Sequence, residues 1–419
     1  MHPNALVEHA TELLHRVLRF EAPADGVVSD YFRQHRALGT RERQTLAEIV
    51  YTVLRRKPAL QHLAQSGTGE VERRFALLAW RGNAAFLRAA LTPQEAQWLA
   101  QVEKVDAAEL PDKLRHNLPD WLAQALQDEV GEGFWPLVET LEGLASLDVR
   151  VNVAKASRDA ALAALTAQGV AAHATPYSPV GLRLVGKPAL HRIDVFQRGE
   201  IEVQDEGSQL IALLTGAKRG EMVADFCAGG GGKTLALGAA MRNSGRLYAF
   251  DVSAHRLAGL KPRLARSGLS NVYPVQIAHE RDERIKRLAG KIDRVLVDAP
   301  CSGLGTLRRH PDLKWRQTAQ TVEAFAPRQT AILAGAARLV KPGGRLVYAT
   351  CSLLRAENEA IADAFTAAHG AAFRVLPVAD ALRRAQVADV DALVDGSCLR
   401  LWPHRHATDG FFAAAWERF

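Results

Sequence analysis

Two cysteines occupy matched positions in the second half of the chain. Cys301 closes an Asp-Ala-Pro-Cys run that begins at Asp298, and Cys351 stands in an Ala-Thr-Cys-Ser run fifty residues later. Each run follows a β-branched apolar stretch of the kind that forms a fully buried parallel strand. In open α/β sheets, chemistry gathers just beyond the carboxyl ends of such strands. We therefore expect both thiols and the Asp298 carboxylate to face one crevice.

Two thiols and a carboxylate in one crevice suit addition chemistry on a pyrimidine. A cysteine thiolate can add to C6 of a cytosine, which makes C5 carbanion-like and able to take a methyl group. A free thiol has a pKa of about 8.5, so a positive group such as Lys233 is needed to favour the thiolate. Asp298 is placed to hydrogen-bond N3 of the base, and Cys301 to take the C5 proton before release. One cysteine alone would more often be core packing, but two at separate strand ends favour catalysis.

A glycine-rich loop from Cys227 to Lys233 follows the first strand of the same half. It is not a phosphate-binding Walker loop, because Cys227 stands where the first glycine is required. It is not the dinucleotide pattern either, because Thr234 stands at the last glycine. What remains is backbone that a ligand can approach closely, and an acid, Asp251, that can accept both ribose hydroxyls. These features favour S-adenosylmethionine, with a plain tight turn as the alternative.

Composition limits the class of protein. The chain has 419 residues, 48% of them hydrophobic, which is enough for two or three domains with sizeable cores. Its four cysteines form no CxxC or Cys/His pattern, so we expect neither a disulfide framework nor a metal site, and a reducing cytoplasmic location. Because the first residues lack an apolar signal core and no apolar run reaches about eighteen residues, we expect a soluble protein without membrane contact.

The basic charge is unevenly distributed. The formal charge is +7, but residues 1–143 hold 16 basic and 20 acidic side chains, against 37 and 26 in residues 144–419. A basic surface on the half with the candidate chemistry is expected if a polyanion lies across it. A generically basic surface is an equally good explanation of charge alone.

The pattern of elements predicts three parts. Residues 1–143 read as all-helical, with a capping box at Thr92 and Glu95. Residues 144–205 read as a small α/β module able to present RNA to a neighbour, or as a structural linker. Residues 206–419 alternate strand and helix, which indicates a doubly wound parallel sheet. Its expected strands are 222–227, 247–250, 272–277, 294–297, 345–349 and 411–414, with a helix over about 331–340 that stops at 341–344.

Three runs carry a resemblance to a known family: Asp-Ala-Pro-Cys-Ser at Cys301, Arg-Arg-His-Pro-Asp-Leu-Lys-Trp ending at Trp315, and Tyr-Ala-Thr-Cys-Ser at Cys351. On these runs the chain resembles the Nop/Sun family of RNA cytosine-5 methyltransferases. The closest form is the bacterial Sun/Fmu (RsmB-type) group acting on 16S ribosomal RNA. The likeness covers about 200–419 and is fainter through 144–200. For 1–143 it rests on helical character alone.

The resemblance implies a Rossmann-like class I methyltransferase sheet, preceded by a small α/β module and an all-helical NusB-like domain. It makes Cys351 the nucleophile and Cys301 the cysteine that aids release, with Asp298 touching base and cofactor. Lys233 completes the expected catalytic group. The expected cofactor-binding residues are Cys227, Ala228, Gly229, Gly230, Gly231, Gly232, Lys233, Asp251, Arg256 and Asp298.

The chain departs from the family pattern in the loop and after the third strand. Gly229 and Gly230 replace an Ala-Pro pair, which loosens the loop entropically. Ile277 and Ala278 stand where the family has Gly-Asp at the adenine, so that contact moves to Glu280 or Asp282 or is missing. The run from 308 to 316 is expected beside the site, where its cations could hold phosphates and Trp315 could stack on a base or pack inward.

The sequence therefore predicts a monomeric, S-adenosylmethionine-dependent RNA (cytosine-5)-methyltransferase that acts on ribosomal RNA. Because the target base must leave its stack, single-stranded or unfolded RNA is the expected substrate. One alternative keeps the chemistry and moves it to tRNA. The other is a catalytically silent RNA-binding assembly factor, against which the presence of both cysteines argues.

Overall fold

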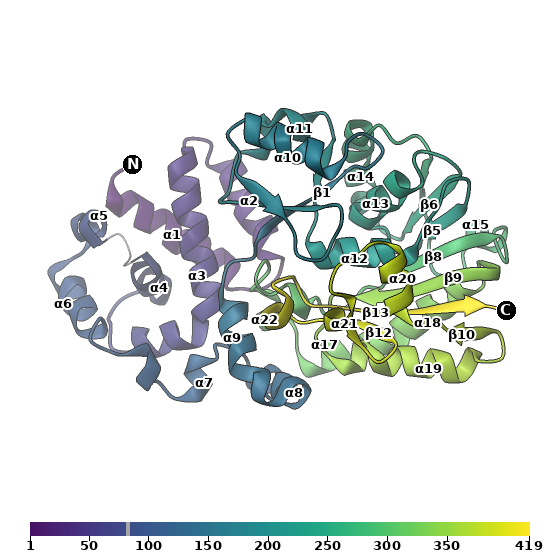
Figure 1. Ribbon diagram of the computed structural model, residues 1–419. Coiled ribbons are helices and arrows are strands. Elements are labelled where there is room, and N and C mark those ends of the chain that lie inside the picture. The colour runs from purple at the N-terminus through teal and green to yellow at the C-terminus, as the bar shows by residue number, and fades with distance from the viewer. Residues whose placement is uncertain (81–83) are drawn as a thin grey trace. The chain divides into compact units, whose positions relative to one another are not determined.

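The computed structural model describes residues 1–80 and 84–419, and the chain divides into two compact units (Figure 1). We call them the helical unit, Met1–Leu144 with Thr306–Ala319, and the sheet unit, Ala145–Gly305 with Gln320–Phe419. The short insert 306–319 thus leaves the sheet unit and returns to it, while its side chains belong to the helical unit.

The helical unit is built on amphipathic helices whose apolar faces share one core. Leu13, Leu46 and Leu77, from three different helices, are fully buried in it. The predicted capping box is confirmed, with Thr92 and Glu95 bonding each other's backbone N–H groups. The helices are α1 Pro3–Val17, α2 Ala24–Gln34, α3 Thr40–Ala64, α4 Val71–Trp80, α5 Ala84–Leu87, α6 Pro93–Val102, α7 Asp112–Arg115, α8 Asp120–Val130, α9 Phe134–Glu142 and, in the insert, α16 Leu313–Arg316.

A break in α3 anchors the insert. Pro58 lacks an N–H group, so the carbonyl of Leu54 loses its helical partner, and the backbone turns at Arg56, whose φ/ψ are non-helical. The indole Nε1 of Trp315 donates to that Leu54 carbonyl at 2.7 Å. The Lys314 ammonium donates to the next carbonyl along α3 at 2.7 Å. The insert therefore satisfies backbone acceptors that the proline frees.

These contacts decide between the two roles considered for the run 308–316. Trp315 packs inward against the core of the helical unit instead of presenting its ring for stacking. Lys314 is buried, and this burial lowers its pKa to about 7. The expectation of a phosphate contact is wrong for Lys314, and of the two roles considered for Trp315 the inward packing is the one observed, because both side chains donate to carbonyls at the break in α3.

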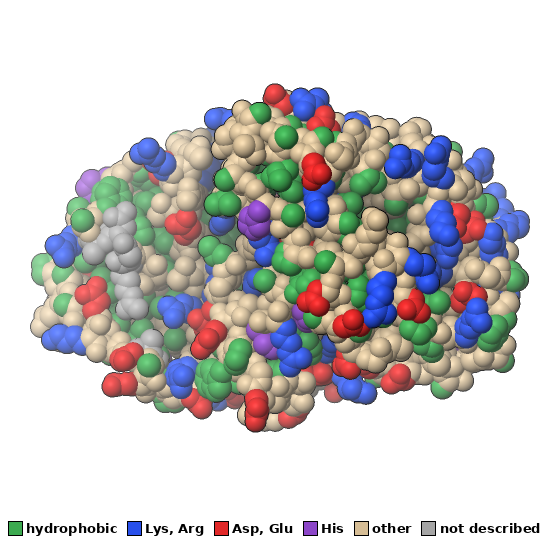
Figure 2. Space-filling model, in the orientation of Figure 1, with side chains coloured by type: hydrophobic (Ala, Val, Ile, Leu, Met, Phe, Trp, Pro, Cys, Tyr) green, Lys and Arg blue, Asp and Glu red, His purple; other side chains and the backbone are tan. Residues whose placement is uncertain are grey.

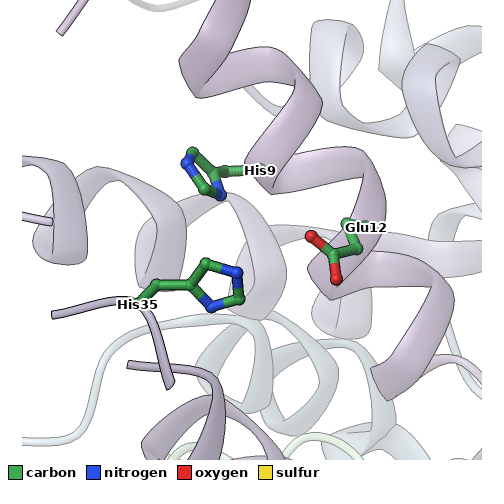
Figure 3. Close-up of side chains that lie close together, drawn as sticks. All are labelled: His9, Glu12 and His35. Atoms are coloured by element: carbon green, nitrogen blue, oxygen red, sulfur yellow. The ribbon is translucent and has the colours of Figure 1, made fainter. Parts of the chain in front are cut away.

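A polar cluster joins α1 to the end of α2 in the same unit. His9, Glu12 and His35 point toward one another (Figure 3), and one ligand atom of each lies within 4.8 Å of the others. The hydroxyl of Tyr31 donates to Glu12 at 2.9 Å and lies 2.7 Å from Nδ1 of His9. His35 stacks on the Tyr31 ring with centroids 4.0 Å apart. Because the Tyr31 hydroxyl already occupies the polar atoms of two of these residues, the cluster is a hydrogen-bond network that joins two helices.

A four-stranded antiparallel sheet of order β2-β3-β1-β4 opens the sheet unit. Ser157 caps α10, since its hydroxyl accepts from the N–H of Ala160. The elements of this module are β1 Leu147–Val151, α10 Arg158–Ala167, β2 Ala172–Ala174, β3 Gly181–Leu184, α11 Asp194–Gln197 and β4 Ile201–Val203.

The large sheet has the order β11-β12-β13-β9-β8-β5-β6-β7, with β10 beside β13. The five strands from β9 to β7 run parallel, and β13 is antiparallel to β9. Its strands are β5 Met222–Asp225, β6 Arg246–Asp251, β7 Val272–Gln276, β8 Ile292–Asp298, β9 Val340–Thr350, β10 Phe373–Val375, β11 Val394–Asp395, β12 Cys398–Leu401 and β13 Phe411–Arg418. The helices are α12 Glu206–Thr215, α13 Gly232–Ala240, α14 Ala254–Ser267, α15 Glu283–Lys286, α17 Ala319–Glu323, α18 Phe325–Ala337, α19 Glu359–His369, α20 Val378–Arg384, α21 Val390–Leu393 and α22 Pro403–His406.

Alternate strand residues supply two separate cores, one on each face of the large sheet. Leu296 and Val347 pack with α12, α13 and α20, whereas Val297 and Tyr348 pack with α18 and α19. A period of two along buried strands explains this division. The sheet is therefore fixed from both sides, and the ends of its strands are held in place.

The region 341–344 differs from the expectation of a loop. The helix α18 ends at Ala337, and β9 already begins at Val340. The register slips there, because Ile292 pairs with Val340 whereas Arg294 pairs with Arg345. The Lys-Pro-Gly-Gly run is thus a bulge within a long strand. No helix in the described part of the chain is long and apolar enough to span a bilayer.

Replacing Trp315 by alanine should destabilise the helical unit. The change removes a partly buried ring and leaves the Leu54 carbonyl without its donor, a loss of about 3 kcal/mol. The midpoint of thermal unfolding, followed by calorimetry, should fall. His310→Ala is the matched control, because His310 is an exposed residue of the same insert. Equal midpoints for the two variants would contradict the anchoring role.

Candidate active site

The two cysteines predicted to converge do so. Sγ of Cys301 lies 3.4 Å from Sγ of Cys351, and both are free thiols. Cys301 follows the end of β8 and Cys351 follows the end of β9, two adjacent parallel strands. The loops approach closely at Gly305, whose N–H donates to the Cys351 carbonyl at 2.8 Å. A Cβ at that position would lie 2.1 Å from the Gly410 carbonyl oxygen, so the approach requires glycine.

A buried carboxylate joins the two cysteine loops. Glu357 is fully buried and accepts from both the N–H and the hydroxyl of Ser302, at 2.8 and 2.5 Å. The hydroxyl of Ser352 donates to the same oxygen as that of Ser302. Gln329 donates to the other oxygen at 3.1 Å. Four donors around two oxygens are the surroundings of an ionised carboxylate. Through its hydrogen bonds to the serine that follows each cysteine, Glu357 therefore fixes the two loops and with them the distance between the thiols.

A partly buried ion pair lies on the same cavity as the thiols. Nζ of Lys233, near the start of α13, is 2.7 Å from Oδ2 of Asp298 and 5.4 Å from the centroid of the Phe411 ring. Burial acts to lower the pKa of Lys233, but Asp298 and Cys351 together raise it above its usual value. Lys233 is therefore an ammonium at neutral pH that interacts electrostatically with Cys351.

The other two cysteines near the site are held protonated. The hydrogen bond with Cys351, burial and the charge of Glu357 raise the pKa of Cys301 well above its usual value. Burial and the neighbouring Asp225 raise the pKa of Cys227 in the same way, with Asp298 adding to the effect. A protonated Cys301 is able to donate toward the Cys351 sulfur.

The glycine loop and the end of β6 form a second part of the site. The N–H of Gly229 donates to Oδ2 of Asp251 at 2.8 Å, and the N–H of Ser253 donates to Oδ1 at 2.7 Å. Ser253 also caps α14 by accepting from the N–H of Arg256. Each Asp251 oxygen retains acceptor capacity beyond these bonds. The loop and the acid therefore lie together, as the sequence pattern predicts.

A cavity of about 950 Å³ connects the two parts. All but one of the expected site residues line it; the exception is Gly231. Gly231 has a positive φ of 82° as the residue before α13, and a Cβ there would lie 2.1 Å from Leu260. It is needed for the turn and for packing and does not contact the cavity. The expected residues that line it are Cys227, Ala228, Gly229, Gly230, Gly232, Lys233, Asp251, Arg256, Asp298, Cys301 and Cys351.

The segment after β7 distinguishes the two acids considered there. Asp282 accepts from the N–H groups of Ala278 and Arg284, both at 2.9 Å, and so caps α15. Glu280 lines the cavity, together with Ile277 and Ala278, whereas Asp282 does not. Glu280 is therefore the acid of this segment that a ligand in the cavity would meet.

The residues present fit S-adenosylmethionine. The cavity combines backbone exposed by glycines, the Asp251 carboxylate for a ribose diol, and several acids for a sulfonium cation. The acids that line it are Asp251, Glu280 and Asp298. Asp225 is buried and does not line the cavity; its Oδ2 accepts from the Thr234 hydroxyl at 2.7 Å, and its Oδ1 has no partner among the described residues. Burial raises the pKa of Asp225 to about 7, with Asp298 adding to the effect.

Sequence reasoning missed Glu357, Gln329 and Arg328. The serine after each cysteine was the available signal for Glu357, but a hydrogen-bond partner five residues after one serine and fifty-five after the other has no pattern of its own. Arg328 lines the cavity from the start of α18, where the sequence shows only a helix. The spacing of residues in the sequence does not predict which side chains the tertiary structure brings together.

The fold and the site are those of a Rossmann-like class I methyltransferase. The model for the "16S rRNA methyltransferase RsmB/F" matches residues 212–417, and one for the RsmF/B-like ferredoxin-like domain matches residues 118–191. The chain belongs to this RsmB/F branch of the Nop/Sun methyltransferase family.

Several relatives support this assignment. The chain is 36% identical over 307 residues to a Synechocystis protein named "Probable ribosomal RNA small subunit methyltransferase B", covering 72% of this chain and 66% of that protein. A ribosomal RNA small subunit methyltransferase B of Sodalis glossinidius is 35% identical over 276 residues, which cover 66% of this chain and 61% of the relative. The matches thus span less than two thirds of these relatives' own lengths.

Solved structures agree in fold. The crystal structure of PH0851 superposes with a TM-score of 0.78 at 25% identity, covering 100% of this chain and 99% of the other. A methyltransferase homologue from Pyrococcus horikoshii gives a TM-score of 0.62 at 28% identity, covering 74% of this chain and 100% of the other.

Glu357→Gln should change the titration of Cys301. Removing the negative charge lowers the pKa of Cys301, so its alkylation by iodoacetamide should begin at lower pH than in the unaltered protein. Mass spectrometry of the Cys301 peptide across a pH series measures this shift. Glu359→Gln is the matched control, because Glu359 pairs with Arg400 at 3.5 Å and belongs to a different network. Identical pH profiles for both variants would refute the electrostatic role of Glu357.

Asp225→Asn should remove a pH dependence of stability. The folded pKa of about 7 lies above the ordinary 3.8, so the folded state holds a proton that the unfolded chain releases. The stability contributed by the neutral carboxyl is complete below pH 3.8 and is lost as pH rises through about 7. Relative to the unaltered protein, the variant should gain up to about 1.4 kcal/mol per pH unit across this window. Denaturant unfolding at pH 5 and pH 8 tests this, and a constant difference would contradict it.

Proposed function

We propose that this protein methylates C5 of a cytosine in RNA, with S-adenosylmethionine as the methyl donor and Cys351 as the nucleophile. The observation that supports this most is the 3.4 Å pair of thiols on the same cavity as a glycine loop and a ribose-type acid. One thiol would suit many roles. Two thiols beside an ammonium suit an addition followed by an elimination.

Cys351 begins the reaction as a thiolate. The Lys233 ammonium, whose pKa the Cys351 charge itself helps to raise, stabilises the negative sulfur. The sulfur would form a bond to C6 of the cytosine, and the electron pair of the C5–C6 double bond would be shared between C5 and the ring atoms toward N3, which Asp298 with Lys233 would face. C5 uses this pair to bind the methyl group, which S-adenosylmethionine supplies and from which the rest of the donor departs as a neutral thioether.

Cys301 completes the reaction. After methyl transfer, C5 carries both the methyl group and its original hydrogen, and that hydrogen must leave as a proton. Cys301 first gives its own proton to solvent and then accepts this one, and the electron pair of the C5–H bond re-forms the double bond while the bond from C6 to Cys351 breaks. Cys351 leaves as the thiolate with which the reaction began, Cys301 is again a thiol, and one proton has been released in total. The short distance between them lets one residue form the adduct and the other resolve it.

The same residues suggest how the cofactor is oriented. Asp251 would hold the ribose hydroxyls, with Arg256 nearby, while the Cys227–Lys233 loop would hold the methionine end. Glu280 is placed for the adenine end of the cavity, and it replaces the aspartate that the family carries earlier in this segment. We infer the orientation from the order of these groups around the cavity.

Ribosomal RNA of the small subunit (16S) is the proposed substrate, in a single-stranded or unfolded form. The named relatives act on this RNA, and an excess of basic residues in 144–419 suits a polyanion. A tRNA substrate would use the same chemistry. A silent assembly factor would have no need of two thiols in one cavity with the donor site, which favours catalysis.

The two thiols should give opposite results when removed. With purified full-length protein, RNA and S-adenosylmethionine, Cys351→Ala should lower methylation by roughly a thousandfold or more and give no denaturation-resistant RNA adduct. Cys301→Ala should also stop turnover, but should accumulate that adduct, because the elimination lacks its base.

Cys398→Ala is the control, because Cys398 lies in β12, away from the cavity. It should methylate normally. Adduct formation by the Cys351 variant, or none by the Cys301 variant, would overturn the assigned roles. Bisulfite sequencing of RNA from cells lacking the protein identifies the target: one methylcytosine that disappears from 16S RNA supports the ribosomal substrate, whereas one that disappears from tRNA replaces it.

A further inference from the structure

A second cavity lies at the opposite end of the large sheet from the thiols. Its volume is about 300 Å³, within the range of small-ligand sites. Arg294, near the start of β8, and Arg345, its neighbour in the middle of β9, line it, whereas Cys351 follows the end of β9. Cys351 lies six positions after Arg345 along the chain, which corresponds to about 20 Å of strand. The cavity is thus distinct from the candidate active site.

The cavity gathers positive charge. Arg294 and Arg345 are direct partners in the register of β8 and β9, and like charges placed side by side on a sheet destabilise it. Arg150 from β1, Lys218 after α12 and Arg384 at the end of α20 also line it. Lys and Arg side chains gather on the part of Figure 2 that carries α20 and the large sheet. Among the described residues, no Asp or Glu lines this cavity.

Protein groups balance this charge only in part. Arg294 pairs with Glu221 at 3.0 Å. Arg345 donates to the neutral carbonyl of Leu214 at 2.7 Å, and Arg150 to the neutral amide of Gln204, also at 2.7 Å. Burial, reinforced by Arg294 and Arg384 and opposed by Glu417 and Glu221, lowers the pKa of Arg345 to about 10. An anion in the cavity would relieve this repulsion.

The remaining wall of the cavity is apolar. It is formed by small side chains of three helices that cover one face of the sheet: Ala212, Leu213, Ala236, Ala240, Ala381 and Ala385. An inorganic anion would use the cations and leave this wall uncovered. A ligand with an anionic group and a flat, weakly polar body uses both, and arginine is well suited to grip phosphate and to stack on a base.

We propose that this cavity binds a nucleotide, with its phosphate held by Arg345 and Arg384 and its base against the alanine wall. The nucleotide is either free or one residue of an RNA strand. If the nucleotide is free, the cavity is a small-molecule site. If it is part of an RNA strand, the cavity is a contact for RNA beyond the target base, and this case rests on the proposed function. In both cases arginine binds a phosphate and the alanine wall contacts a base.

Two pairs of adjacent residues provide a matched test in the full-length protein. Arg384→Ala and Lys218→Ala each remove a cation that lines the cavity. Arg383→Ala and Arg219→Ala remove the neighbouring exposed cation, which does not line it. The change in net charge is the same within each pair. Any difference between partners therefore reports the cavity and not the long-range field of the protein.

Binding is measured with inorganic phosphate and AMP by calorimetry, and with a single-stranded oligoribonucleotide by fluorescence anisotropy over a range of salt. The cavity variants should bind about tenfold more weakly than their partners. With the oligonucleotide, the slope of log affinity against log salt should fall by about one for each cation removed. Ala385→Leu, which fills the cavity without changing charge, should weaken binding while the unfolding midpoint stays within the range of the other variants.

Each outcome is decisive. Selective loss with AMP identifies a free nucleotide, and selective loss with the oligonucleotide alone identifies a nucleotide within RNA. If each cavity variant binds all three probes as its partner does, the nucleotide site is refuted. That result would leave the methyl-transfer proposal intact, because the two thiol variants are judged by adduct formation at the other end of the sheet.

Discussion

The arrangement of this site depends on one buried carboxylate. Glu357 receives hydrogen bonds from Ser302 and Ser352, the residues that directly follow the two cysteines. The sheet alone places Cys301 and Cys351 at neighbouring strand ends, roughly 5 Å apart in backbone terms. Closing the sulfurs to 3.4 Å requires the loops themselves to be fixed. A buried charge is costly unless it is fully hydrogen-bonded, so the same network that satisfies Glu357 also makes the loops rigid.

Much of this arrangement could be predicted from the sequence because strand geometry is regular. The apolar runs before Cys301 and Cys351 specify buried parallel strands, and parallel strands bring their carboxyl ends to one edge of the sheet. The caps at Ser157 and Ser253 were predictable for a similar reason, since they are local. The bulge at 341–344 was not, because Pro and Gly normally end an element and only pairing with β8 keeps this stretch in the sheet.

The unpredictable features are those that depend on a distant partner. Trp315 and Lys314 sit in a basic, aromatic run that resembles a nucleic-acid contact, yet both donate to carbonyls of α3. The explanation is a residue some 250 positions earlier: Pro58 removes a helical donor, and the insert replaces it. Composition describes what a side chain is able to do, whereas a missing hydrogen bond elsewhere in the chain decides what it does.

The three cysteines that line the cavity have different charged neighbours, although their thiols are chemically identical. Cys227 lies near Asp225 and Asp298, which hold its proton, so it is suited to forming the wall of a site and not to attack. Cys301 is held protonated by its neighbour and by the charge of Glu357. Cys351 is the cysteine whose charge helps to raise the pKa of Lys233, so these two residues interact electrostatically. In the proposed reaction the nucleophile must lose its proton before the resolving base does, and this difference in neighbouring charge suits that order in a way that the distance between the sulfurs alone does not.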